Sequence, residues 1–278
     1  MIATPVSRET LLHVVKLLPA APQILSQLGQ LLLDINSDLS EVTRLLRRDA
    51  GLTARIIRVA NSAYYGAGLP ASSLEEALAR VGFREVYRLT GFAAAAQLAD
   101  QRLAVYDISG VQLRENALLT ALLMEDLALA AGVDGRAAYT AGLLRSTGKI
   151  ALDRVLRQDP SAVVPATITH LGEWEQQVAG LDNCAAAAVI LGEWRFPRDL
   201  ITTIGQHYVP PADTHPMASL LNLAAGEAER AGFGLVGEGA YWEITPAKLR
   251  TAGVTAADLG GASVRALNEF ATLRAVLA

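Results

Sequence analysis

Cysteine, histidine and aromatic residues are scarce in this sequence of 278 residues. The single cysteine, Cys184, cannot form a disulfide within the chain, which favours a reducing, cytoplasmic location. Aromatic residues make up 5% and the apolar residues are mainly Ala and Leu, which favours closely packed helices over a β-sandwich. The four histidines are few for a helical hydrolase that binds metals through histidine-rich clusters.

A membrane-spanning segment, a secretory signal and a phosphate-binding loop are also missing. The best membrane candidate, 117–131, contains Glu125 and Asp126 and is well short of the roughly 20 apolar residues that a spanning helix needs. Met1–Pro5 is too short and too mixed for a signal peptide, and no Walker-type glycine loop occurs. The formal net charge of −4 gives no long-range attraction for nucleic acid or anionic lipid. We therefore expect neither nucleic acid nor a membrane as a main partner.

Apolar residues at helical spacing are abundant instead. Between residues 24 and 99 they predict a series of short amphipathic helices. The patterns Asp38–Glu41 and Ser73–Glu76 resemble capping boxes, which mark helix starts. Another helix is expected after Pro197, because proline suits the start of a helix. Longer helices are predicted at 112–131, 136–157, 183–194, 217–231 and 263–277.

Two stretches interrupt this helical pattern. Three prolines between Pro210 and Pro216 form the clearest linker, because they cannot propagate a helix. The glycine-rich stretch Gly232–Ile244 fits either an ordered loop or a short hairpin. We expect an all-α fold with two packed helical subdomains. They are residues 1–104 and 105–212, and a C-terminal helical extension at 213–278 packs on them.

Five short motifs occur in series: Leu18-Pro19-Ala20-Ala21-Pro22, LLRRDA at 45–50, NSAYYG at 61–66, SLEEA at 73–77 and GLL at 142–144. In this order and with compatible spacing, the chain resembles the HDOD family over most of residues 14–210. Agreement of several motifs is far more specific than agreement of one. The resemblance implies a multi-helical HD-like bundle, related to the HD-type metal-dependent phosphohydrolases. It also implies a role in bacterial signalling, usually without demonstrated catalysis.

The same resemblance indicates where the metal site of the hydrolases would lie. HD-type hydrolases hold metals with an adjacent His–Asp pair in a stretch like GLLHDIGK, and the metal activates a water that attacks a phosphoester. Here residues 142–149 read GLLRSTGK, so Arg145 and Ser146 occupy the two ligand positions. Arginine is permanently cationic and has no lone pair for a metal, and a serine hydroxyl replaces a carboxylate poorly.

Other ligand positions implied by the resemblance are also changed. An upstream histidine corresponds to Glu115 or Asn116, and a later one to Asn183. In the terminal histidine cluster only His207 remains. Such a set cannot assemble a hydrolytic metal site of the usual type. We therefore expect no enzyme activity, no metal and no cofactor.

Two roles stay open for this altered pocket. Arg145 and Glu115 can form a buried ion pair that preserves the helix arrangement. Alternatively, Arg145, Lys149 and His207 can hold an anion such as a nucleotide phosphate. The ion pair is favoured, because buried charges are ordinarily paired. The altered pocket comprises Glu115, Arg145, Ser146, Lys149, Asn183 and His207.

A candidate partner surface lies in the N-terminal part. Asn61 and Gly66 fit turns at the end of a helix, and Tyr64 and Tyr65 offer rings with polar ends. Packing between helical layers is the favoured interpretation, and a recognition surface is the alternative. Arginines also recur here at helical spacing, which is typical of a solvated face and also suits an acidic partner. The candidate partner surface comprises Asn61, Tyr64, Tyr65, Arg55 and Arg58, beside Arg44, Arg47 and Arg48.

The sequence therefore predicts a non-enzymatic signalling module that acts through protein–protein interaction. We expect a regulatory partner in trans, such as a kinase, a response regulator or a cyclic-dinucleotide enzyme, and homo-oligomerisation stays open. One alternative is a divergent phosphohydrolase that uses unconventional ligands such as Glu115, Asp153 and His207. Another is a nucleotide or anion sensor in the altered pocket.

Overall fold

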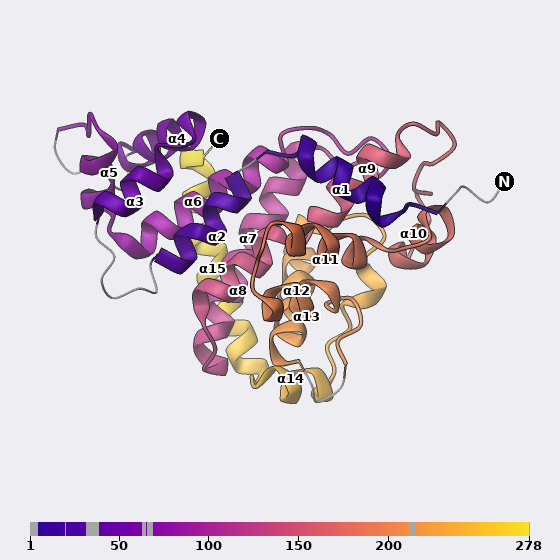
Figure 1. Cartoon of the computed structure of the whole chain (residues 1–278). Helices are drawn as coiled ribbons and strands as arrows, with labels where there is room; N and C mark the ends of the chain where they lie inside the picture. Colours follow the sequence, from indigo (N-terminus) through magenta and orange to yellow (C-terminus); the bar gives the residue numbers. More distant parts are fainter. Residues whose placement is uncertain are drawn as a thin grey trace. The chain divides into compact units, whose positions relative to one another are not determined.

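The structure is a computed structural model that describes residues 5–19, 21–31, 39–62, 65, 69–211 and 215–277. Within these ranges every regular element is a helix (Figure 1). The isolated backbone bridge among them joins Leu103 to Ile108. The prediction of an all-α fold is therefore confirmed. None of the described helices is both long and apolar enough to cross a membrane.

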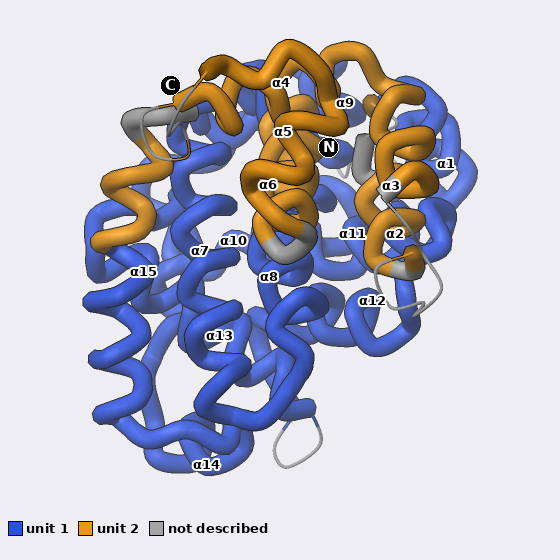
Figure 2. The backbone as a smooth tube through the Cα atoms, turned by 90° about the vertical axis from the view of Figure 1, so that its left-hand side faces the viewer, with its two compact units in different colours: residues 1–18, 98–267 blue, residues 19–97, 268–278 orange. Residues whose placement is uncertain are grey.

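The chain forms two compact units, which Figure 2 shows in different colours. Unit 1 contains residues 1–18 and 98–267, and unit 2 contains residues 19–97 and 268–278. Both units are therefore assembled from segments that are far apart in the sequence. The three-part division expected from the sequence stays a prediction.

Unit 2 is a bundle of short helices around an aliphatic core. Its helix starts follow the sequence signals: the Ser73 hydroxyl accepts a hydrogen bond from the Glu76 backbone N–H at 3.2 Å, as the capping pattern predicts. The expected cap at Asp38 lies outside the described residues. The core includes Leu25, Leu28, Val42, Leu46, Leu52, Ile56, Leu78 and Val86. The helices are α2 (Ala21–Leu31), α3 (Leu39–Leu46), α4 (Ala50–Ala60), α5 (Leu74–Val81) and α6 (Phe83–Leu98).

Unit 1 contains the longer helices. The 22-residue helix α7 begins with a capping box between Ser109 and Gln112, and side chains are buried around most of its circumference. This burial places α7 in the middle of the unit, where α8 and α13 pack on it. The helices are α1 (Arg8–Leu17), α7 (Gly110–Ala131), α8 (Gly135–Leu144), α9 (Thr147–Leu156), α10 (Leu171–Ala179), α11 (Asn183–Glu193), α12 (Arg198–Gly205), α13 (Pro216–Ala228) and α14 (Pro246–Ala252). Helix α15 (Ala256–Leu277) begins in unit 1 and ends in unit 2.

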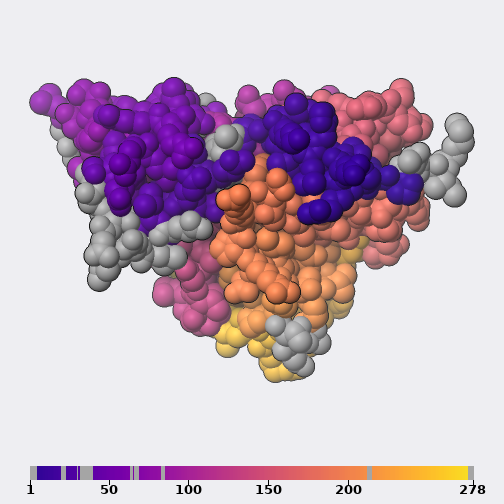
Figure 3. All heavy atoms as spheres, viewed as in Figure 1, coloured from indigo at the N-terminus to yellow at the C-terminus, as the bar shows by residue number. Residues whose placement is uncertain are grey.

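Helix α1 packs on α9 and α11 of the same unit. The space-filling view shows its indigo atoms against the pink and orange atoms of this unit (Figure 3). The Arg154 side chain also donates to the Leu17 carbonyl oxygen at 3.3 Å. The first helix of the chain therefore covers the helices that carry the altered pocket.

One helix prediction is wrong, and the error lies at two residues of the altered pocket, Arg145 and Ser146. The apolar pattern predicts a single helix over 136–157, but the structure ends α8 at Leu144 and starts α9 at Thr147. The two halves pack on different helices: at Gly142 a Cβ would lie 2.5 Å from the Ala121 Cα, and at Gly148 a Cβ would lie 1.8 Å from the Asn183 carbonyl oxygen. Because α8 packs on α7 and α9 packs on α11, the chain bends at Arg145 and Ser146.

The glycine-rich stretch Gly232–Ile244 is an ordered loop and not a hairpin. It begins inside the turn Glu229–Phe233, which is kinked at Gly232 (φ 87°), and it contains a short 3₁₀ helix at Gly239–Tyr241. Gly237 has a φ of 73°, a conformation that favours glycine, and a Cβ there would lie 2.7 Å from the Ile168 side chain. The loop is therefore packed closely against the segment that precedes α10.

Candidate functional site

A buried charge cluster lies at the bend between α8 and α9. Arg145 is the residue that follows α8, and Lys149 lies in the first turn of α9. Their exposed fractions are 1% and 0%. Arginine and lysine are almost never fully buried unless they are paired, so both cations require acceptors inside unit 1.

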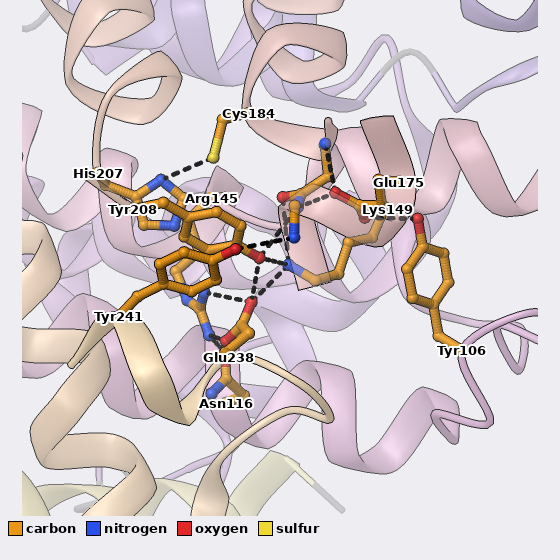
Figure 4. Close-up of polar contacts among 12 residues, drawn as sticks. Tyr106, Asn116, Arg145, Lys149, Glu175, Cys184, His207, Tyr208, Glu238 and Tyr241 are labelled. Carbon is orange, nitrogen blue, oxygen red and sulfur yellow. Dashed lines mark hydrogen bonds and ion pairs between the residues drawn. The ribbon is translucent and has the colours of Figure 1, made fainter. Parts of the chain in front are cut away.

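Glu238 of the glycine-rich loop supplies the main acceptor, as Figure 4 shows. Arg145 donates from Nη1 to Oε1 at 3.1 Å and from Nη2 to Oε2 at 2.9 Å, so the pair is bidentate. Lys149 Nζ forms a second ion pair with Oε1. The Tyr208 hydroxyl donates to the same oxygen at 2.8 Å. One carboxylate, itself 0% exposed, therefore receives hydrogen bonds from three side chains.

The cluster continues from Lys149 towards α10 and α11. Lys149 also donates to the Asn183 side-chain oxygen at 3.2 Å and to the Tyr208 hydroxyl at 2.8 Å. Asn183 in turn donates from its backbone N–H and from its side chain to Glu175, both at 2.7 Å. The Tyr106 hydroxyl donates to the other oxygen of Glu175 at 2.7 Å. We define the buried charge cluster as Tyr106, Asn116, Arg145, Lys149, Glu175, Asn183, Tyr208 and Glu238.

The structure corrects the expected partner of Arg145. The carboxylate that pairs with it is Glu238, 93 residues later, and not Glu115. The next residue of α7, Asn116, accepts from Arg145 Nη2 at 2.7 Å and donates to the Phe233 carbonyl oxygen at 2.7 Å. Glu115 is only partly buried, whereas Asn116 is fully buried, because neighbouring residues of a helix face different directions.

The charges of the cluster stabilise one another. Burial alone would raise the pKa of Glu238, but the charges of Arg145 and Lys149 outweigh burial and hold that pKa well below its usual range. Burial alone would lower the pKa of Arg145, but Glu238 outweighs it and raises that pKa. Burial raises the pKa of Glu175, against the opposing charge of Lys149. With Glu175 ionised, two cations face two carboxylates and the interior is electrically balanced.

Aromatic rings enclose the two cations. The Arg145 guanidinium lies 5.7 Å from the centre of the Trp242 ring, and Lys149 Nζ lies 5.3 Å from the centre of the Tyr208 ring. Tyr208 stacks on Tyr241 with 4.3 Å between ring centres. Such contacts favour a desolvated cation, so they add to the stabilisation by Glu238.

His207, the remaining histidine of the altered pocket, is neutral. Burial, and then the charge of Arg145, lower its pKa to about 3. Nδ1 lies 2.8 Å from the Ile204 carbonyl oxygen, so this nitrogen carries the proton. Cys184 Sγ lies 3.5 Å from the same nitrogen, and burial raises the pKa of its thiol well above the usual value. The pair therefore holds no thiolate nucleophile and His207 carries no charge for an anion.

Ser146 and Asp153 differ in their hydrogen bonding. The Ser146 hydroxyl is buried without a hydrogen-bond partner in the structure. Asp153 accepts from the Val105 backbone N–H at 2.9 Å and forms an ion pair with Arg157. The described residues contain no group of three or more His, Cys, Asp or Glu side chains that could hold a metal ion. The alternative ligand set Glu115, Asp153 and His207 is therefore not brought together.

The residues of the candidate partner surface lie in unit 2. Asn61 ends α4, and its side chain accepts from the Ala71 backbone N–H at 2.6 Å and donates to the Ala71 carbonyl oxygen at 2.9 Å. Arg80 donates to the Asn61 side chain at 3.0 Å. Tyr65 donates its hydroxyl hydrogen to Glu85. Asn61 and Tyr65 therefore have local structural roles, and Tyr64 lies outside the described residues.

Comparison with known families identifies the fold around this cluster. The model of the HDOD domain matches residues 18–210, more than half of the chain. The chain belongs to the HDOD family. The match covers Arg145, Lys149, Asn183 and the other cluster residues before 210, but not Glu238. The carboxylate that pairs with both buried cations therefore comes from beyond the matched HDOD region.

Similar proteins support the same fold. A solved HDOD domain protein of unknown function from Geobacter sulfurreducens is 21% identical, with a TM-score of 0.70 over 94% of this chain and 92% of that chain. A solved structure from Marinobacter aquaeolei VT8 is 20% identical, with a TM-score of 0.70 over 94% of this chain and 59% of that chain. An uncharacterised protein of Treponema pallidum (strain Nichols) is 23% identical over 221 residues, which are 75% of this HDOD chain. The match spans 41% of that relative's length.

Sequence reasoning found Arg145, Lys149 and Asn183 but missed Glu238, Glu175 and Tyr208. Glu238 stands between two glycines in a loop with no helical period, so its burial has no signature in the sequence. The available signal was the unusual Gly-Glu-Gly setting, since glycines permit close approach of a backbone. Glu175 was hidden in an ordinary amphipathic helix.

Proposed function

We propose that this chain is a non-catalytic regulatory module that acts by binding other proteins. The observation that carries the proposal is the buried, bidentate pair between Arg145 and Glu238. It occupies the place where, by resemblance to the HD-type hydrolases, a His–Asp pair would hold a catalytic metal. An ion pair that is permanently formed there takes over the structural role of the metal and none of its chemistry.

Electrostatics argue against a hydrolase in this pocket. The buried cations Arg145 and Lys149 balance the carboxylates around them, so no net negative charge is left to attract a metal ion such as Mn²⁺. Glu238, the carboxylate best placed to attract a metal, is already neutralised by both of them. A nucleophilic water also needs a route and a base, and the one histidine of the pocket is buried and bound to a backbone carbonyl.

A nucleotide or anion sensor is disfavoured by the same contacts. Arg145, Lys149 and Tyr208 direct their donors at Glu238, so an external phosphate would have to displace this carboxylate. Displacement would leave Glu238 without its partners, or would require the glycine-rich loop to unpack from the Leu171 backbone N–H, which donates to the Gly237 carbonyl oxygen at 2.9 Å. The pocket is therefore more consistent with a rigid core than with a ligand site.

Since the pocket suits neither hydrolysis nor anion binding, contacts with other proteins are the remaining mode of action. With the interior filled, the surface is the part of the chain that remains available for signalling. Proteins with this fold carry names from two functional classes, hydrolysis and signal transduction. Two from Shewanella amazonensis SB2B carry provisional phosphohydrolase names, and one from Marinobacter aquaeolei VT8 carries a provisional signal-transduction name. Fold alone does not choose between these functions, so the side chains of the pocket decide our proposal.

The test combines metal analysis with a hydrolysis assay. The full chain, purified without chelator, is analysed for Mn, Fe and Zn and is assayed on bis(p-nitrophenyl) phosphate and cyclic dinucleotides. We expect far less than one metal ion per chain and no hydrolysis above a heat-denatured sample. Stoichiometric metal together with hydrolysis that disappears with chelator would overturn the proposal.

A variant at Glu238 distinguishes a chain that has no metal site from a chain whose metal site is blocked by the glycine-rich loop. Glu238→Ala removes the internal carboxylate while Arg145 and Lys149 remain. If the two cations exclude metal, this variant also stays metal-free and inactive. Metal uptake by Glu238→Ala would instead indicate a latent hydrolytic site that the loop keeps closed.

A further inference from the structure

Five arginines are close together along one stretch of unit 2, which we call the arginine face: Arg44, Arg47, Arg48, Arg55 and Arg58. They lie on α3 and α4 and on the turn between these helices. Residues 39–60 contain these five cations but only two carboxylates, Glu41 and Asp49. This local excess of positive charge occurs in a chain whose formal net charge is −4.

Two of these cations have no ion-pair or hydrogen-bond partner among the described residues. Arg55 and Arg58 are three residues apart on α4, and neither forms an ion pair or hydrogen bond with any part of the chain that the structure describes. Other arginines of unit 2 differ: Arg80 donates to the Ala60 carbonyl oxygen, and Arg88 forms ion pairs with Glu85 and Glu269. The absence of partners is therefore a local property of α4.

The other three arginines are held loosely. Arg44 lies 3.6 Å from Glu41, and its side chain is 78% exposed. Arg47 pairs with Glu75 at 2.6 Å and is 61% exposed. Arg48 donates to the neutral side chain of Gln27 at 3.1 Å. Exposed pairs of this kind contribute little to stability, so a stronger acceptor replaces them at small cost.

Three hollows lie beside these arginines, and each hollow is lined by two of them. Arg55 and Arg58 border one that is lined by Ile56, Leu89 and Phe92. Arg44 and Arg48 border a second hollow, and Arg44 and Arg47 border a third. The hollow beside Arg55 and Arg58 is too small for a side chain, so a partner would meet these two arginines at the surface.

We propose that the arginine face binds an acidic segment of a partner protein, with the carboxylates of that segment on the arginines. The guanidinium fork matches the geometry of a carboxylate, and arginine is favoured at protein interfaces. The arginines extend over two helices, so an extended polypeptide fits them better than one small molecule. Glu41 and Glu75 lie among the arginines and disfavour the continuous phosphates of a nucleic acid.

This inference deepens the proposed function and rests on it, because it names the chemistry of the partner. The test measures binding of the full chain to a fluorescein-labelled peptide of Glu, Asp and Leu by fluorescence anisotropy. The double variant Arg55→Glu/Arg58→Glu reverses the two unpaired cations. Its matched control is Arg198→Glu/Arg250→Glu, which reverses two exposed arginines of unit 1 and changes the net charge equally. Circular dichroism checks that both variants are folded.

We expect saturable binding to the wild-type chain that weakens with salt. The Arg55→Glu/Arg58→Glu variant should bind at least about tenfold more weakly, because each reversal replaces attraction by repulsion. Two controls distinguish binding at this surface from a general effect of charge. They are the control variant with the acidic peptide, and a Gln/Asn/Leu peptide with the wild-type chain. Lack of binding to wild type, equal weakening in both variants, or tighter binding of a labelled DNA duplex would each overturn the inference. None of these results changes the metal and hydrolysis assays, so the two proposals fail separately.

Discussion

Two arginines, Arg145 of unit 1 and Arg58 of unit 2, differ in the burial and pairing that determine their role. Arg145 of unit 1 is 1% exposed and donates to Glu238 and Asn116. Arg58 of unit 2 is exposed and has no partner among the described residues. A buried arginine must find acceptors during folding, because an unpaired charge in the interior is very costly. An exposed one is satisfied by water and stays available for a partner.

Under our two proposals, this difference separates structure from recognition. The altered pocket is then the charged core of unit 1. The surface that would recognise a partner lies on unit 2, where cations are in excess of nearby carboxylates. The predictions that follow test this separation, beginning with the change that should have the largest effect.

Removal of the internal carboxylate should be the most damaging change. Glu238→Ala leaves Arg145 and Lys149 buried and without their common partner, which should cost about 3–5 kcal/mol of the free energy of unfolding. Denaturation in urea, followed by circular dichroism, measures this value. Glu243→Ala removes an exposed carboxylate from the same loop and should change stability by less than about 0.5 kcal/mol. Equal losses in both variants would contradict the buried charge cluster.

Close packing beside the cluster gives the second prediction. In Gly148→Ala the new Cβ would lie 1.8 Å from the Asn183 carbonyl oxygen, so α9 and α11 would have to separate. We expect a loss of about 1–3 kcal/mol or more. The control Gly260→Ala lies in α15 with no atom within 4 Å of the added Cβ, and should stabilise the helix by about 1 kcal/mol. The same sign for both substitutions would contradict the close approach at Gly148.

The third prediction concerns pH and the neutral His207. Its folded pKa is about 3, and the ordinary value is 6.5, so the unfolded chain binds this proton first as the pH falls. Stability should therefore decrease below the ordinary pKa, by about 2 kcal/mol between about pH 7.5 and 5. His207→Gln removes the contribution of His207 to this pH dependence. The free energy of unfolding, measured by urea denaturation at each pH, should therefore change less over that interval. An unchanged slope would show that His207 titrates normally in the folded chain.

The smallest effect on stability is expected on the arginine face. Arg55→Ala and Arg58→Ala remove side chains without ion pairs, so each should change the free energy of unfolding by less than about 0.5 kcal/mol. Arg145→Ala, the same substitution in the cluster, should instead destabilise the chain by several kcal/mol. Thermal denaturation of the three variants in one buffer makes the comparison. A large loss for Arg55→Ala would show that this side chain is structural and not available to a partner.

Much of the fold could be predicted from local sequence signals. Apolar residues at helical spacing predict α7, and the Ser73–Glu76 pattern predicts the start of α5, because both signals act within a few residues. The motif series predicts the HDOD family, which the family match confirms. The break between α8 and α9 could not be predicted, since the apolar pattern continues through it and the cause is packing on two different helices.

The site shows the same limit in its chemistry. The loss of the His–Asp pair can be read directly from Arg145 and Ser146, because the identity of a ligand is a property of single residues. The replacement of that pair cannot be read, because Glu238 is 93 residues away from Arg145 and no local rule links a loop carboxylate to a distant helix.

By itself, the sequence determined that this chain is helical, resembles the HDOD family and carries Arg145 and Ser146 where that resemblance implies a metal-binding His–Asp pair. Helix formation, capping and ligand chemistry depend on residues that are close in the chain or on one residue alone. The tertiary structure decided that Glu238 pairs with Arg145 and Lys149 and that His207 is neutral. It also decided that Arg55 and Arg58 have no partner within the part of the chain that the structure describes. Pairing, desolvation and exposure depend on which distant segments come together, and only folding brings them into contact.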